Sequence, residues 1–154
     1  MVIGVIGSGS CDEQVAGVAE AVGREIARAG ATLICGGLGG VMEAACRGAK
    51  GAGGVTIGIL PGSDPYEANE FVDHAVATGM GQARNVVIVL SSDAVVAVSG
   101  GYGTLSEIAT ALKMSVPVVG IGTWALEAPV VRATDPEQAV AVACREAQRR
   151  DRGR

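Results

Sequence analysis

The sequence contains few aromatic residues, few lysines and no long apolar run. Aromatic residues make up 3% of the 154 residues, and Lys50 and Lys113 are the only lysines. Apolar runs reach about six residues, whereas a membrane helix needs roughly 20. Neither lysine stands in the Gly-Lys-Ser/Thr pattern of a P-loop. The net charge of −4 disfavours a general nucleic-acid binder, which presents a basic face. We therefore expect neither a membrane segment nor a nucleic-acid partner.

The four cysteines lie far apart and form no metal-ligand pattern. Cys11, Cys35, Cys46 and Cys144 include no Cys-x-x-Cys pair and no Cys/His cluster, so no metal site is expected. Unpaired cysteines are typical of the reducing cytoplasm, and the chain starts on a strand pattern without a charged leader, so we expect a cytoplasmic protein. The single histidine, His74, has no evident serine or cysteine partner, and we interpret it as a strand-end residue.

Small residues dominate the chain, with 24 glycines and apolar runs rich in alanine and valine. Short apolar runs alternate with helical patterns, which is typical of βαβ crossovers. The expected strands are 2–6, 31–35, 55–60, 71–76, 94–98, 117–121 and 130–133; the expected helices are 12–29, 41–49, about 81–90, one from the Gly100 turn to about 114, and 136–148. We predict a single Rossmann-like, three-layer α/β domain over 1–154, with a mostly parallel sheet of about six or seven strands and a frayed tail at 149–154.

Three glycine-rich turns each follow an expected strand, at 7–9, 36–40 and 100–103. In an open parallel sheet these turns meet at the carboxyl edge, where ligands bind. A glycine turn that opens a helix aims unpaired backbone N–H groups outward, and the helix dipole favours an anion there. The first turn is not a dinucleotide fingerprint, because Asp12 stands where the third glycine belongs. For the second turn, close packing of helix on strand is the alternative to ligand approach.

Glu107 has two interpretations that can coexist. Thr104 and Glu107 stand at capping-box spacing, so each side chain could bond the other residue's backbone amide. Alternatively, the carboxylate lies in the first helical turn, stays ionised in the field of the helix dipole, and stabilises a positively charged sugar or activates water. Arg84 is either a surface or helix-end residue, or a functional residue that binds a phosphate in two-pronged fashion or orients Glu107.

Taken together, these motifs resemble the LOG-like family, formerly described as lysine decarboxylases. Residues 36–43 resemble its GGxxGxM turn, residues 80–85 its Met-x-x-Arg-Lys helix start, and residues 99–107 its PGGxGTxxE motif. The resemblance extends from residue 3 to about 124. It implies a homo-oligomer, a dimer or tetramer, whose hydrolase members cleave the N-glycosidic bond of nucleoside 5′-monophosphates. Arg84 and Glu107 would be the catalytic pair, and Gly100, Gly101, Gly103 and Thr104 the phosphate cradle.

Two residues depart from the family pattern, because Asn85 replaces its lysine and Ser99 its proline. The chain is more similar to a sister branch that includes molybdenum-cofactor carrier proteins. That likeness implies a protein that binds a phosphorylated pterin-like or nucleotide-like ligand without requiring a cofactor, and the phosphoribohydrolase is the alternative. Lysine decarboxylation is disfavoured because Lys50 and Lys113 lie away from the turns. The expected ligand-binding residues are Gly7, Ser8, Gly9, Gly36, Gly37, Gly39, Gly40, Met42, Asn85, Ser99, Gly100, Gly101, Tyr102, Gly103 and Thr104.

Overall fold

Seven strands form one sheet in the computed structural model, which describes residues 1–152. In chain order the strands are β1 (Val2–Ile6), β2 (Thr32–Cys35), β3 (Thr56–Leu60), β4 (His74–Ala77), β5 (Ala94–Val98), β6 (Val118–Ile121) and β7 (Val130–Arg132). Their order across the sheet is β4-β3-β2-β1-β5-β6-β7, and each neighbouring pair is parallel. The structure confirms the α/β, Rossmann-like fold class.

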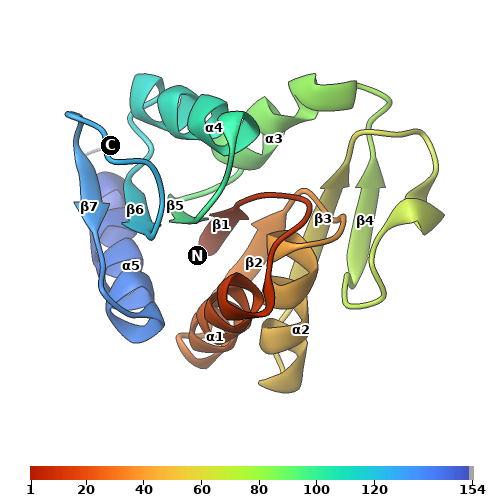
Figure 1. Ribbon diagram of the computed structural model, residues 1–154, viewed down its shortest axis with the longest axis horizontal. Helices are drawn as coiled ribbons and strands as arrows, with labels where there is room; N and C mark the ends of the chain where they lie inside the picture. Colours follow the sequence, from red (N-terminus) through yellow and green to blue (C-terminus); the bar gives the residue numbers. More distant parts are fainter. Residues whose placement is uncertain (153–154) are drawn as a thin grey trace.

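Helices cover both faces of the sheet (Figure 1). The helices are α1 (Glu13–Arg28), α2 (Val41–Gly51), α3 (Asn85–Leu90), α4 (Tyr102–Lys113) and α5 (Pro136–Arg152). Figure 1 shows α1, α2 and α5 below the sheet and α3 and α4 above it. Short 3₁₀ helices, η1 (Pro65–Glu67) and η2 (Gly81–Arg84), lie in the connections around β4. None of the helices in residues 1–152 is long and apolar enough to cross a bilayer.

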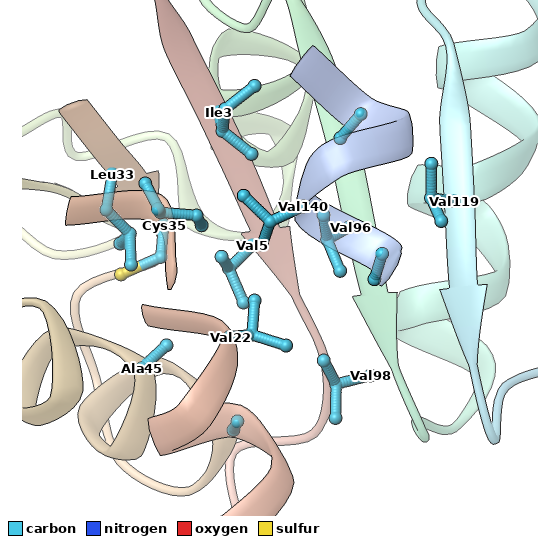
Figure 2. Close-up of a cluster of buried hydrophobic side chains, with 14 of the residues drawn as sticks. Ile3, Val5, Val22, Leu33, Cys35, Ala45, Val96, Val98, Val119 and Val140 are labelled. Carbon is cyan, nitrogen blue, oxygen red and sulfur yellow. The ribbon is translucent and has the colours of Figure 1, made fainter. Parts of the chain in front are cut away.

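Successive strand residues face opposite layers, which explains why the central strands are apolar throughout. Val5 and Val96 pack among the buried residues of α1, α2 and α5, as Figure 2 shows. Ile6 and Val95 belong instead to the second core, with α3 and α4. All five residues of β5 are buried, which places this strand in the middle of the molecule.

Glycine allows α1 and α2 to pack at very short range. A Cβ atom at Gly23 would lie 1.9 Å from the Ala45 carbonyl oxygen, and one at Gly48 would lie 1.8 Å from the Glu20 carbonyl oxygen. Because backbone cannot yield as a flexible side chain can, these contacts require glycine. The close packing fixes where both helices begin, and hence where the turns after β1 and β2 lie.

The direction of strand addition reverses at β1. The chain adds β2, β3 and β4 on one side of β1, then crosses back to place β5 on the other side. Such a switch point opens a crevice at the carboxyl ends of the strands. The turns after β1, β2 and β5 therefore converge at this crevice.

Local boundaries differ from the sequence expectations at two places before β5. The fourth strand begins at His74 rather than at residue 71. Phe71 does not join the β-ladder, because its amide donates a hydrogen bond to Asn69 Oδ1 and its carbonyl accepts one from the Thr56 hydroxyl. The expected helix at 81–90 is divided into η2 and α3, and Arg84 lies at the junction.

Two further boundaries differ after β5. Helix α4 begins at Tyr102, before Thr104, which had been the expected capping residue. Helix α5 continues to Arg152, beyond the expected end at 148, and Arg150 donates a hydrogen bond to the Ser92 carbonyl at 3.2 Å. The helix therefore includes 149–152 of the segment for which a frayed tail is expected; the fraying itself stays a prediction, and 153–154 lie outside the described residues.

Candidate functional site

The turns after β1 and β2 interlock to form the floor of the site. The Val41 amide donates to the Ser8 carbonyl at 3.0 Å. Gly40 has a φ of 62°, and a Cβ there would lie 2.4 Å from the same Ser8 oxygen. At Gly39, a Cβ would lie 3.2 Å from the Gly9 carbonyl oxygen. These two glycines therefore let one turn rest on the other, which is the packing interpretation of this motif.

Gly37 also serves packing, whereas Gly36 faces the site. A Cβ at Gly37 would lie 2.8 Å from Leu60 Cδ2 of β3. A Cβ at Gly36 would lie 2.6 Å from both Arg84 Nη2 and Met42 Sδ. Gly36 is therefore the residue that allows the Arg84 guanidinium to lie over the end of β2.

Arg84 is buried, with 6% of its surface exposed, which excludes the interpretation as a surface arginine. Its Nη1 donates to Asn85 Oδ1 and its Nη2 donates to the Gly36 carbonyl at 3.5 Å. Its Nε has no hydrogen-bond partner among the described residues. A buried donor without an acceptor is costly, so this nitrogen marks a place where an acceptor from a ligand would be stabilising.

Glu107 is also 6% exposed and lies in the second turn of α4. Burial raises the pKa of its carboxyl group to about 7, and the positive charge of Arg84 opposes that shift. The structure places no ion pair between the two side chains in the described part of the chain. The expectation that Glu107 lies in the first helical turn is wrong, because α4 begins at Tyr102, and the burial of the carboxyl group raises its pKa.

The first turn of α4 supplies backbone donors at the site. Gly101 is the N-cap and no side chain caps the helix, so the capping box between Thr104 and Glu107 does not form. The first N–H groups of a helix lack intrahelical acceptors. Gly100, at a φ of 109°, lets the chain fold close over Thr104, since a Cβ there would lie 2.2 Å from Thr104 Oγ1. Ser99 has a φ of 51°, a left-handed conformation that proline cannot adopt.

These elements enclose an open cavity of about 290 Å³ at the switch point. Of the expected site residues, the structure brings eleven to its wall: Gly7, Ser8, Gly9, Gly36, Met42, Arg84, Asn85, Gly101, Gly103, Thr104 and Glu107. It places the other six behind or beside the wall: Gly37, Gly39, Gly40, Ser99, Gly100 and Tyr102. The described site therefore joins the uncapped end of α4, a buried cation and a titratable carboxyl group.

Four wall residues were not anticipated from the sequence: Val5, Ile6, Leu38 and Gln82. Leu38 and Gln82 stand inside the motifs at 36–43 and 80–85, so their position there is a signal that the sequence offers. Val5 and Ile6 read as ordinary core residues of β1, and no sequence signal distinguishes them. Both residues are almost fully buried, so they add little exposed surface to the cavity.

The fold and the pocket define the class of protein: a Rossmann-like α/β protein with a small-molecule pocket at the carboxyl edge of its sheet. The chain belongs to the SLOG cluster4 family, whose model matches residues 1–149. An uncharacterized protein of Archaeoglobus fulgidus is 52% identical over 136 residues, which cover 84% of this chain and 89% of that protein.

Two solved structures are similar over nearly the whole chain. The molybdenum cofactor binding protein of Rippkaea orientalis matches with a TM-score of 0.88 and 40% identity, covering 94% of this chain and 95% of that chain. The molybdenum cofactor carrier protein of Chlamydomonas reinhardtii matches with a TM-score of 0.87 and 38% identity, covering 96% and 98%.

A more distant relative is a probable cytokinin riboside 5′-monophosphate phosphoribohydrolase of rice, Oryza sativa subsp. japonica. It is 36% identical over 90 residues, which cover 56% of this chain and 37% of that protein. Together with the family match and the two solved structures, this relative confirms the sequence resemblance to the LOG-like family.

Proposed function

We propose that the protein binds a phosphorylated pterin, as a carrier of the molybdenum cofactor. The observation that carries this proposal is the buried Arg84, whose Nε lacks a partner beside the uncapped first turn of α4. Both features require an acceptor, and a phosphate offers several acceptor oxygens together with negative charge.

The charge balance of the pocket supports an anionic ligand. Arg84 carries a positive charge, and Glu107, with a pKa of about 7, is protonated in part of the molecules at neutral pH. A neutral Glu107 leaves Arg84 without a competing carboxylate, so a phosphate can become its partner. The names of the two solved relatives, a cofactor binding protein and a cofactor carrier protein, support the pterin as the ligand.

A binding assay with the cofactor tests the proposal. Molybdenum cofactor released from a molybdoenzyme is mixed with the protein without oxygen, free cofactor is removed by gel filtration, and bound pterin is measured by fluorescence after oxidation. We expect near-stoichiometric retention, and Arg84→Ala should weaken it about 10- to 100-fold, as a charge-assisted hydrogen bond would. Arg145→Ala, an exposed arginine of α5, is the matched control and should bind like the wild type. Equal retention by both variants would contradict the proposal.

The phosphoribohydrolase is the second candidate, and the titration of Glu107 favours it. A carboxyl group with a pKa of about 7 can both donate and accept a proton at neutral pH, which suits proton transfer to a leaving base. The rice relative supports this candidate over only part of the chain. Asn85, in place of the family's lysine, removes one positive charge from the wall, and this departure favours the carrier over the hydrolase.

Release of free base separates the two candidates. The protein is incubated with a panel of nucleoside 5′-monophosphates, including N6-modified adenylates, and free base is measured by liquid chromatography. A hydrolase would release base, and Glu107→Gln would abolish the release. Absence of release from a protein that retains the pterin excludes the hydrolase and leaves the carrier.

We also propose that the protein is a homo-oligomer with an interface on α3. After Asn85 every residue of this helix is apolar, yet Val86 is 40% exposed and Leu90 is 54% exposed. Met114, at the end of the neighbouring α4, is 41% exposed. A second copy that covers α3 would remove these side chains from water.

A further inference from the structure

Tyr102 is an aromatic residue on the surface, so burial in the hydrophobic core does not explain its position. It is the first residue of α4, and 81% of its surface is exposed. Its chain neighbours Gly101 and Gly103 both line the pocket. Tyr102 therefore stands between two wall residues, at the rim of the cavity and beside the backbone donors of the helix, although it does not itself line the wall.

Trp124 holds the ring of Tyr102 in an aromatic pair. The two ring centroids are 5.7 Å apart, and the planes are inclined by 37°. The Trp124 indole N–H donates to the Gly101 carbonyl at 3.1 Å, across 23 residues of sequence. The adjacent Thr123 hydroxyl donates to the Ser99 carbonyl at 2.7 Å. Two hydrogen bonds thus tie the loop after β6 to the turn after β5 and orient the indole.

The pairing is notable because the chain has so few aromatic residues. The sequence contains one Trp, two Tyr and one Phe, so half of them meet at this rim. Phe71 lies against Arg47, and Tyr66 stands alone on η1 with 93% of its surface exposed. Of the four aromatic residues, Tyr102 and Trp124 are the ones that touch the turn of the binding pocket.

We propose that Tyr102 and Trp124 form a stacking subsite for the planar heteroaromatic ring of the phosphorylated ligand, a pterin or a purine. The inference rests on the proposed function, because the phosphate has to occupy the first turn of α4 for the ring to reach the rim. The exposed face of Tyr102 offers a flat apolar surface, and the indole behind it limits the motion of the ring. Aromatic stacking of this kind is sequence- and substituent-tolerant, so the subsite recognises a ring rather than one base.

Four probes separate the phosphate from the ring. The affinities of a pterin monophosphate, adenosine 5′-monophosphate, ribose 5-phosphate and inorganic phosphate are measured by calorimetry on the whole protein. We expect a ring-bearing phosphate to bind at least tenfold more tightly than ribose 5-phosphate. A preference for the pterin over the adenylate identifies the pterin as the source of the ring, and the reverse preference identifies a purine.

Trp124 provides a second readout, because it is the only tryptophan in the chain. Adenosine 5′-monophosphate should change its fluorescence, and ribose 5-phosphate should change it far less, since the indole supports the stacked ring. Fluorescence that responds to dilution of the protein, but not to a ring-bearing phosphate, would show instead that a second copy covers the pair and would overturn the proposal.

Variants at the rim complete the test. Tyr102→Ala should lower the ratio of the two affinities, ring-bearing phosphate over ribose 5-phosphate, about tenfold, and Tyr102→Phe should retain the ratio. Tyr66→Ala, the other exposed tyrosine, is the matched control and should behave like the wild type. If Tyr102→Ala leaves the ratio unchanged, or lowers both affinities equally, the stacking subsite is wrong while the proposed function stands. If none of the phosphorylated probes binds, the proposed function itself fails.

Discussion

Glu107 is the residue whose protonation couples the pocket to pH. Burial lifts the pKa of its carboxyl group from 4.5 to about 7. Between these two values the folded protein keeps a proton that the unfolded chain has lost, so the free energy of unfolding falls as the pH rises. The contribution of protonated Glu107 to the free energy of unfolding is complete below pH 4.5 and is lost once the pH passes about 7.

Glu107→Gln should remove this pH dependence. A rise in pKa from 4.5 to about 7 corresponds to at most about 3 kcal/mol in the free energy of unfolding. When the pH is raised from 4.5 to 8, the variant should therefore gain up to that amount of stability relative to the wild type. Urea unfolding of both proteins at the two pH values measures the difference. Glu137→Gln, on the exposed start of α5, is the control. Parallel pH profiles for wild type and Glu107→Gln would contradict the assignment.

Gly36 has no side chain, and this leaves room for the Arg84 guanidinium. In Gly36→Ala the new methyl group would lie 2.6 Å from Arg84 Nη2 and from Met42 Sδ. Both atoms lie near the ends of flexible side chains, so we expect the fold to adapt and Arg84 to move away from the pocket. Affinity for inorganic phosphate should fall about tenfold, with a loss of stability of about 1 kcal/mol. Calorimetry and urea unfolding check the two numbers, and unchanged phosphate binding would show that Arg84 does not act from this position.

At the residue scale, the sequence predicted which residue types would matter and missed their surroundings. Arg84 and Glu107 were expected from motifs, and the structure brings both to one pocket. The burial that raises the pKa of Glu107 depends on the packing of α4 against the sheet, which short-range patterns do not contain. The tilted pairing of Trp124 with Tyr102 was missed for a similar reason, because the hydrogen bond that orients the indole spans 23 residues of sequence.

At the scale of elements, the α1–α2 contact makes the sharpest prediction. Gly48→Ala would place a methyl group 1.8 Å from the Glu20 carbonyl oxygen, so the two helices must separate. We expect a loss of about 3 kcal/mol or more in the free energy of unfolding. Gly17→Ala, on α1 with open space around it, is the matched control and should stabilise the protein by about 0.5–1 kcal/mol. Similar effects of the two substitutions would show that the helices do not touch in this way.

Element positions were predictable where the spacing of the apolar residues and the length of the run indicate the same kind of element, as in β1, β5 and the body of α1. The start of α4 was not, because glycines in the sequence indicate a turn up to residue 103, whereas Gly103 lies inside the helix. The first turn of this helix contains Gly103 and has no capping side chain, so its free N–H groups are available to a ligand. The departure from the expected start thus coincides with the proposed binding site.

At the scale of the whole molecule, the proposed interface on α3 makes a prediction about assembly. Leu90→Glu places a charge on the exposed apolar face at the end of α3, so it should convert the oligomer into a monomer. Val55→Glu, a similarly exposed apolar position at the amino edge of β3, is the control and should leave the assembly intact. Sedimentation velocity at micromolar concentration distinguishes the species. A wild-type protein that sediments as a monomer would rule out the interface.

The topology explains why one pocket collects motifs from three parts of the chain. Alternating strands and helices predict a parallel sheet, and a parallel sheet gathers its strand-end turns at one edge. The sequence does not reveal which turns become neighbours; that follows from β5 returning to lie beside β1. The crevice between those two strands is where the pocket opens.

The most direct test of the account is a two-dimensional ¹H–¹⁵N spectrum of the protein during titration with a pterin monophosphate. The Arg84 Nε–H group and the backbone amides of Gly103 and Thr104 are all observable as separate signals. We predict that these signals shift together and saturate at one ligand per chain, because one phosphate accepts from all three. If the ligand instead shifts signals at a distant surface, such as that around Asp93 and Gln148, and leaves these three in place, the proposed site is wrong.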